Sequence, residues 1–278
     1  MSERPELGRI GVWIGGPPSP ELARGLDELG YGAIWIGGSP GGDLKGVEST
    51  LAATNRITVA TGIVNIWRDD PATIVASYHR LADTYPGRFL LGVGAGHPEA
   101  TSRYTKPYDA LVQYLDRLDA GGVPQSRRAL AALGPRVLRL AADRTAGAHP
   151  YLVTPEHTRQ ARELLGPDVL LAPEQHVVLD SDKARGREFA RGVLRYHLQL
   201  RNYTTNWRRL GFTDDDLADG GSDRLVDGLV GLGNAKQIAT RITEHLDAGA
   251  DHVCVQLIAA KGVDLLPGFT DLAAQLIT

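Results

Sequence analysis

The chain alternates short apolar runs rich in β-branched residues with longer stretches of helical periodicity. Such alternation is typical of repeated β-α units around a parallel sheet. The runs that read as strands occupy residues 9–14, 33–36, 57–63, 89–94, 129–133, 148–152, 169–171 (with a continuation through 177–179) and 252–257. Eight strands within 278 residues predict an α/β fold in which residues 1–278 form a single (β/α)8 TIM barrel domain.

Three of the predicted helices begin with the same pattern. Ser19, Asp70 and Thr154 each precede a proline, and a short polar side chain followed by proline is a typical helix start. A different pattern fills residues 182–233, which are too many for an ordinary connection between strand and helix. This segment holds a helical stretch over 184–200 and then a piece rich in aspartate and glycine. We therefore expect an insertion after strand seven.

Composition narrows the classes of function. A net charge of −3 and a pI near 6.2, without lysine or arginine runs, disfavour binding to nucleic acid. Cys254 is the only cysteine, so one chain can form neither a disulfide nor a cysteine-based metal site. The eight histidines are scattered, and we expect no metal. No apolar leader or membrane-length apolar stretch is visible, which predicts a cytoplasmic protein with no membrane contact.

Glycine-rich sequences follow three of the predicted strands. They are Gly15-Gly16, Gly37-Gly38 and the run from Gly92 through Gly94 to Gly96. In a (β/α)8 enzyme the active site is built from the loops at the carboxyl ends of the strands. Glycines at these positions allow the backbone to approach a flat ligand closely, although tight turns alone would also account for them.

Several longer motifs, taken together and in order, resemble one known family. They are GYGAIWIGG at 30–38, TGIVNIWRDDPATIVASYHRLADTYPGRFLLGVGAGHPE at 61–99, AALGPRVLRLAAD at 131–143 and AHPYLVTPEHT at 148–158. The chain resembles the luciferase-like monooxygenase superfamily and, within it, the F-420-dependent oxidoreductases. This resemblance implies hydride transfer between the deazaflavin coenzyme F-420 and a small organic substrate. It also implies a homodimer, with an interface on the second and third helices.

The resemblance assigns a cofactor site to the ends of strands three and four. In related enzymes a non-prolyl cis peptide forms a bulge behind the (deaza)flavin ring, and here it would fall around Gly62, Ile63 and Val64. Asn65 would reach the ring edge, and backbone groups from Gly94 to Gly96 would meet it. The cofactor-binding residues expected on this basis are Trp13, Ser39, Gly62, Ile63, Val64, Asn65, Gly94, Ala95, Gly96, His149, Tyr151 and Thr154.

Two positions depart from the pattern of F-420-dependent relatives. Those enzymes often carry a histidine where this chain has Ser39 and a glutamate where it has His97. An imidazole has an ordinary pKa near neutrality and can replace a carboxylic acid as a proton donor. We therefore predict His97 as the principal catalytic acid or base, with Glu99 as the nearby alternative.

The cofactor phosphate is expected at the loop that follows strand six. His149 and Tyr151 lie in or beside this loop, and Thr154 caps the next helix, whose amino end could bind an anion. The loop has no lysine or arginine, which relatives frequently place here. For the substrate pocket, polar Glu174 and His176 at strand seven are candidates, together with Trp207 from the insertion as part of a lid.

Other functions remain open. An FMN-dependent luciferase-like monooxygenase is the main alternative, because the same cofactor-binding site could hold FMN. A non-catalytic flavin-binding barrel is a third possibility, since fold does not determine function. Glu99 and Glu174 could also face each other as a glycosidase pair, but the Asn-Glu pair typical of such barrels at strand four is missing.

Overall fold

The computed structural model describes residues 6–97 and 106–277. Its strands are all parallel to their paired neighbours. They are β1 (Ile10–Ile14), β2 (Ala33–Ile36), β3 (Thr58–Thr61), β4 (Val64–Asn65), β5 (Phe89–Gly94), β6 (Arg128–Leu130), β7 (Gly147–Ala148), β8 (Leu170–Leu171), β9 (Glu174–Leu179), β10 (Val230–Gly233) and β11 (Val253–Leu257).

The sheet follows the order β10-β9-β11-β1-β2-β3-β5-β6-β7-β8, with β4 paired to β5. β8 and β9 are two parts of one barrel strand, separated by Ala172 and by Pro173, which has no backbone N–H to donate. On one side Ala172 N donates to Ala148 O, and on the other Cys254 N donates to Pro173 O. The ring of strands therefore closes as a (β/α)8 barrel, and β10 adds an extra strand beside β9.

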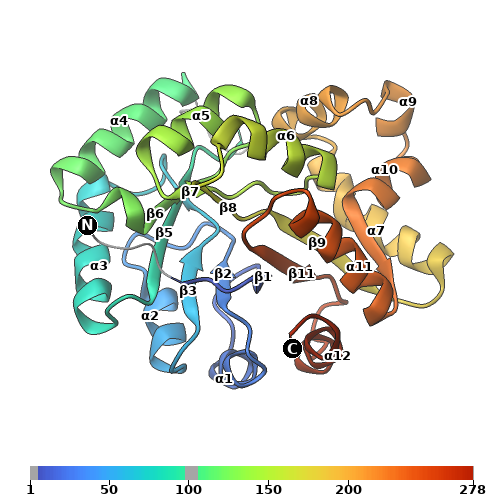
Figure 1. The fold of residues 1–278 in the computed structure, drawn as a ribbon, viewed down its shortest axis with the longest axis horizontal. Coiled ribbons are helices and arrows are strands. Elements are labelled where there is room, and N and C mark those ends of the chain that lie inside the picture. The colour runs from blue at the N-terminus through green and yellow to red at the C-terminus, as the bar shows by residue number, and fades with distance from the viewer. Residues whose placement is uncertain (1–5, 98–105, 278) are drawn as a thin grey trace.

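Helices surround this barrel (Figure 1). They are α1 (Pro20–Glu28), α2 (Lys45–Ala52), α3 (Pro71–Thr84), α4 (Pro107–Ala120), α5 (Pro135–Arg144), α6 (Pro155–Leu165), α7 (Lys183–His197), α8 (Arg201–Arg209), α9 (Asp214–Leu217), α10 (Asp223–Leu229), α11 (Ala235–Asp247) and α12 (Leu266–Leu276), with a 3-10 turn at Gln125–Arg127. Ser19, Asp70 and Thr154 cap α1, α3 and α6 as predicted. Among the described helices, none is long and apolar enough to cross a membrane.

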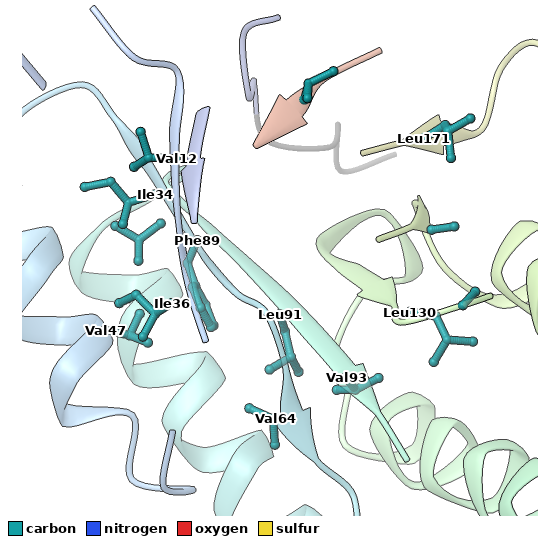
Figure 2. Packing of buried hydrophobic residues seen from close by; sticks show 14 of the residues in the cluster. Val12, Ile34, Ile36, Val47, Val64, Phe89, Leu91, Val93, Leu130 and Leu171 are labelled. Atoms are coloured by element: carbon teal, nitrogen blue, oxygen red, sulfur yellow. The ribbon is translucent and has the colours of Figure 1, made fainter. Parts of the chain in front are cut away.

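The largest hydrophobic cluster lies between the outer face of the barrel and the helices. Figure 2 shows part of it, with Ile34 and Ile36 of β2 and Val47 of α2 among its members. A second cluster fills the barrel interior around Trp35 and consists mainly of small side chains, including several alanines and Cys254. The interior is therefore packed with side chains below the carboxyl ends of the strands.

A third cluster belongs to the segment after strand seven. Helices α7, α8, α9 and α10, which we call the cap, pack around Leu194 and the fully buried Trp207. The same cluster includes Leu152 from the loop after β7 and Val178 from β9. The cap is thus joined through a continuous apolar core to the carboxyl end of the barrel.

The predicted (β/α)8 fold with an insertion after strand seven is confirmed, while several strand bounds differ and one strand was not predicted. The predicted strand 148–152 ends at Ala148, because Pro150 lacks an N–H and Leu152 has a left-handed φ of +55°. The predicted strand 129–133 ends at Leu130. β10, with the sequence VGLG, was not predicted, since two glycines in four residues weaken the strand pattern.

Candidate active site

A cis peptide bond joins Gly62 and Ile63 between β3 and β4. This confirms the predicted position of the cis bond. The bulge is tied to its neighbours on both sides, since Gly62 N donates to Ile36 O at 2.8 Å and Trp13 Nε1 donates to Gly62 O at 3.3 Å. Beyond it, Asn65 of β4 pairs with Gly94 of β5. The strand ends where a flat ring was predicted are therefore held in a fixed arrangement.

The glycines of this region are required by packing within the protein. A Cβ atom on Gly62 would lie 2.7 Å from Trp13 Nε1 and 3.2 Å from His149 Nε2. On Gly96, whose φ is +61°, it would lie 2.8 Å from Asn65 Nδ2. Any larger residue at these positions would force the neighbouring side chains to move. The same glycines leave Gly62, Ala95 and Gly96 partly exposed as a surface of small residues.

His97 follows this surface and connects it to the cap. Its Nδ1 lies 3.1 Å from Asn202 Oδ1 on α8, and its ring centroid lies 5.3 Å from that of Tyr203. An amide oxygen can only accept a hydrogen bond, so Nδ1 carries the proton and Nε2 is the basic nitrogen of neutral His97. Glu99, the predicted alternative to His97, lies outside the described residues.

Aromatic rings fill the mouth of the barrel. Tyr151 is at their centre, with its ring centroid 5.2 Å from Trp13, 5.3 Å from His176 and 5.9 Å from His197. Tyr203 from α8 lies 5.2 Å from His197 and 6.1 Å from Tyr151. We call Trp13, Tyr151, His176, His197 and Tyr203 the mouth cluster. Burial, followed by the nearby His176, lowers the pKa of His197 to about 4, so this ring is neutral at pH 7.

Glu174 and His176 of β9 form a buried polar pair inside the mouth. Glu174 Oε1 lies 2.6 Å from His176 Nδ1, and the two side chains are 0% and 1% exposed. Glu174 Oε2 also accepts a hydrogen bond from Leu152 N at 3.1 Å. His176 Nε2, on the other side of the ring, has no hydrogen-bond partner among the described residues.

His149 lies deeper in the barrel, at the level of Trp35. Its ring stacks on Trp35 with centroids 4.1 Å apart, and its Nδ1 lies 2.8 Å from Ala172 O. Its Nε2 has no hydrogen-bond partner among the described residues. Burial lowers the pKa of His149 to about 4 and raises the pKa of the neighbouring Cys254 thiol. Both groups are therefore neutral at pH 7.

The loop that leads into α6, where a phosphate was expected, is buried up to the cap residue Thr154, whereas Pro155 is partly exposed and Glu156 is exposed. Leu152, Val153 and Thr154 are 1%, 0% and 8% exposed. The Thr154 hydroxyl accepts from His157 N at 3.2 Å, and Trp207 Nε1 donates to Leu152 O at 3.1 Å. Trp207 therefore packs over this loop inside the cap.

The structure brings most of the predicted site residues to one end of the barrel. Trp13, Tyr151, Glu174 and His176 gather in the mouth cluster or contact it, and Gly62 lies beside Trp13. Ser39 follows β2, where its carbonyl oxygen accepts a hydrogen bond from Arg68.

Sequence reasoning missed His197, Asn202 and Gln256, whose side chain accepts from Tyr151 OH at 2.9 Å. For His197 and Asn202 a usable signal was present, since polar and aromatic residues are dense in YHLQLRNYTTNW at 196–207. No group of three or more His, Cys, Asp or Glu side chains that could hold a metal occurs within residues 6–97 and 106–277.

Solved structures with this fold include enzymes of two cofactor classes. An F420-dependent secondary alcohol dehydrogenase, solved with an F420-acetone adduct, matches with a TM-score of 0.73 and 14% identity over 98% of this chain and 99% of its own. The coenzyme F420-dependent tetrahydromethanopterin reductase from Methanopyrus kandleri matches with 0.69 and 14% over 98% and 99%. The oxygenating constituent of 3,6-diketocamphane monooxygenase from Pseudomonas putida, in complex with FMN, matches with 0.68 and 16% over 96% of each chain.

At these identities the matches establish the fold and leave the chemistry open. No curated protein sequence matches the chain significantly. A family model described as luciferase-like monooxygenase matches residues 18–120, which run from α1 to the end of α4 and include the cis bulge. The sequence of this part therefore matches the luciferase-like monooxygenase family model, and the fold of nearly the whole chain is shared with the solved enzymes described above.

Proposed function

We propose that the protein is an oxidoreductase that transfers a hydride between coenzyme F-420 and a small organic substrate at the barrel mouth. The observation that carries the proposal is the bulge between β3 and β4, where Gly62, Ile63 and Asn65 are partly exposed and Gly96 packs closely against Asn65. Solved F420-dependent enzymes that share the fold support it.

The residues at the bulge fit the ring of such a cofactor. Gly62, Ile63 and Asn65 are each partly exposed, so a flat ring can lie against the bulge while the Asn65 amide reaches its edge. The amino end of α6 fits the phosphate less well, because Leu152 and Val153 are buried and the Thr154 hydroxyl already accepts a hydrogen bond from His157 N. When bound, F-420 would supply the carbon that accepts or donates the hydride.

His97 is proposed as the group that exchanges a proton with the substrate. Its Nδ1–H is directed to Asn202 Oδ1, which orients the ring and makes Nε2 the proton-accepting atom. The buried mouth cluster would exclude water from the reacting atoms. Glu174 contacts His176 Nδ1 and so orients the imidazole ring. We propose that both residues line the substrate side of the pocket.

Cofactor binding tests the proposal directly. The protein should be titrated with F-420 and with FMN, following the fluorescence and absorbance of each. Saturable binding of F-420 that is weakened by Gly62→Val is expected, since the valine side chain would displace Trp13 from the bulge. Gly192→Val is the matched control, because nothing lies within 4 Å of a Cβ at Gly192 on α7. If neither F-420 nor FMN bound to the protein, the proposal would be contradicted.

An FMN-dependent monooxygenase is the second candidate, and one observation favours it. The loop 149–154 has no lysine or arginine for the long anionic tail of F-420, whereas FMN carries a single phosphate. Tighter binding of FMN together with oxygen consumption during turnover would decide for this function. Stoichiometric binding with no turnover of any donor would instead indicate a non-catalytic flavin-binding barrel.

A further inference from the structure

A cavity of about 500 Å³ lies at the carboxyl ends of β9 and β11, between α7 and α12. Its floor is formed by Val178, Leu257 and Ile258 at the strand ends, and its sides include Phe189 of α7 and Pro267 of α12. The two strands pair with each other, and α7 and α12 lie on either side of them (Figure 1). This volume falls within the range of small-molecule pockets, and the ends of barrel strands seven and eight are frequent ligand positions.

Exposed apolar side chains concentrate at this cavity. Among the described residues, the large hydrophobic side chains with high exposure are Phe189 (38%), Tyr196 (54%) and Val263 (54%). Phe189 and Val263 line the cavity, and Tyr196 follows Phe189 by seven residues, which places both on one face of α7. Exposed apolar groups gathered in one place mark a binding surface rather than ordinary surface.

The charges around the cavity favour a cation. Arg185 binds Asp180 with Nε and Nη2, each at 2.6 Å from a carboxylate oxygen, so this pair is internally neutralised. Asp264 and Asp271 also line the cavity, and within the described part of the chain neither forms an ion pair. Lys261 lies in the adjacent loop but does not line the cavity. The lining therefore carries two uncompensated negative charges beside an apolar floor.

The cavity adjoins the mouth of the barrel. Val178 and Ile258 lie two residues after His176 and Gln256, so each shares the side of its strand with that polar residue. His176 belongs to the mouth cluster, and Gln256 accepts the hydrogen bond of Tyr151. A ligand in the cavity would thus approach the mouth cluster along these two strands.

We propose that this cavity binds a small organic cation with an apolar body, such as an alkylammonium group. The apolar part lies on Val178, Ile258 and Phe189, and the charged nitrogen faces Asp264 and Asp271. This site is separate from the predicted ring site at Gly62–Asn65, and the proposal does not depend on the identity of the cofactor.

Three probes of equal chain length test the proposal: n-hexylammonium, hexanoate and 1-hexanol. Each is titrated into ¹⁵N-labelled protein, with the amide signals of Val263 and Gly268 as reporters. We expect hexylammonium to bind about tenfold more tightly than hexanoate at low salt, because two carboxylates near a partly solvated charge each change affinity several-fold. 1-Hexanol should lie between them.

Variants separate the charged and apolar contributions. In the double variant Asp264→Asn with Asp271→Asn, hexylammonium and hexanoate should bind with nearly equal affinity. Asp271→Asn alone, on an exposed helix surface, should reduce the preference for hexylammonium only in part. Phe189→Ser should weaken all three probes. Asp247→Asn, an exposed aspartate on α11 outside the cavity, is the matched control and should change nothing.

Several results would overturn the proposal. Hexanoate binding as tightly as hexylammonium would remove the role of the carboxylates. If the amide signals of Val263 and Gly268 did not shift, the probe would bind elsewhere. If Asp247→Asn lost as much of the preference for hexylammonium as the cavity variants, the preference would come from the net charge of the protein and not from the cavity. The absence of binding by any probe up to its solubility would exclude a site for this chemical class.

Discussion

His97 and Asn202 join parts of the chain that are 105 residues apart, one after β5 and the other on α8. A histidine so placed has its tautomer set by the amide and its ring held by Tyr203. This arrangement suits proton exchange, because the hydrogen bond at Nδ1 fixes the orientation of the ring. It also makes the cap a part of the proposed site.

Replacing His97 by alanine should lower kcat by about 10²–10⁴-fold if it is the general acid or base, with cofactor affinity within a few-fold. The measurement is steady-state turnover together with a cofactor titration. Asn202→Ala should show a smaller loss and a shifted pH profile, because the ring loses its orienting partner. Unchanged turnover in His97→Ala, with collapse in Glu99→Gln, would transfer the role to Glu99.

Glu174→Gln tests the buried pair. The amide oxygen of glutamine can still accept from His176 Nδ1, but its NH2 group replaces the acceptor that Leu152 N now uses. We expect a loss of about 1–3 kcal/mol in the free energy of unfolding, because a buried N–H loses its partner. Urea unfolding measures it. Glu163→Gln, on an exposed face of α6, is the control and should cost far less.

At the scale of elements, α8 closes one side of the barrel mouth. Trp207 is fully buried and donates to Leu152 O, while Tyr203 enters the mouth cluster. The same packing buries Leu152 in the loop that leads into α6, which no pattern local to α6 could reveal.

Trp207→Ala should destabilise the protein by about 3–5 kcal/mol, because it removes a large side chain from a packed cluster. Trp207→Phe keeps most of the volume and loses the hydrogen bond to Leu152, so a smaller cost is expected. Thermal and urea unfolding of the three proteins gives both values. Equal stability of Trp207→Ala and the unaltered protein would show that α8 is not fixed to the barrel in solution.

At the scale of the whole molecule, buried neutral histidines connect stability to pH. Burial lowers the pKa values of His149, His197 and His252 to about 4. In the unfolded chain these groups take up protons near pH 6.5. Between pH 6.5 and pH 4 the unfolded state therefore binds more protons than the folded state, and stability must fall as the pH falls through this window.

The expected slope is up to about 1.4 kcal/mol per pH unit for each of these histidines. Urea unfolding at pH 7, 6 and 5 should show a decline that becomes steeper below pH 6.5. In His197→Gln the slope of the free energy of unfolding against pH should decrease by the contribution of one histidine. A stability that is flat from pH 7 to 5 would mean that these imidazoles are not buried in solution.

Self-association is also a property of the whole molecule. We propose a homodimer through α2 and α3, as the family resemblance implies. The α3 face around Val75 and His79 is partly used within the chain, since His79 Nε2 lies 2.8 Å from Gly121 O beside α4. Exposed Ala72 and Ala76 remain for a partner. Light scattering at micromolar concentration should give twice the chain mass, and a monomeric mass would contradict the dimer.

Local sequence determined the elements of this protein. Short apolar runs rich in β-branched residues located most barrel strands, and Ser19, Asp70 and Thr154 marked helix starts, because caps and prolines act within a few residues. The resemblance of the motif at 61–99 to a known family located the cis bulge. These features depend on neighbours in sequence, which is why the sequence reveals them.

Only the tertiary structure decided which side chains meet at the mouth. Glu174 and His176 are close in sequence, but their contacts with Leu152, Tyr151 and His197 come from other elements. The burial of Leu152 against the cap and the cavity at the carboxyl ends of β9 and β11 likewise depend on packing between distant segments. Hydrogen bonds and burial at such places are set by the closed barrel and its cap, so they become visible only once the chain is folded.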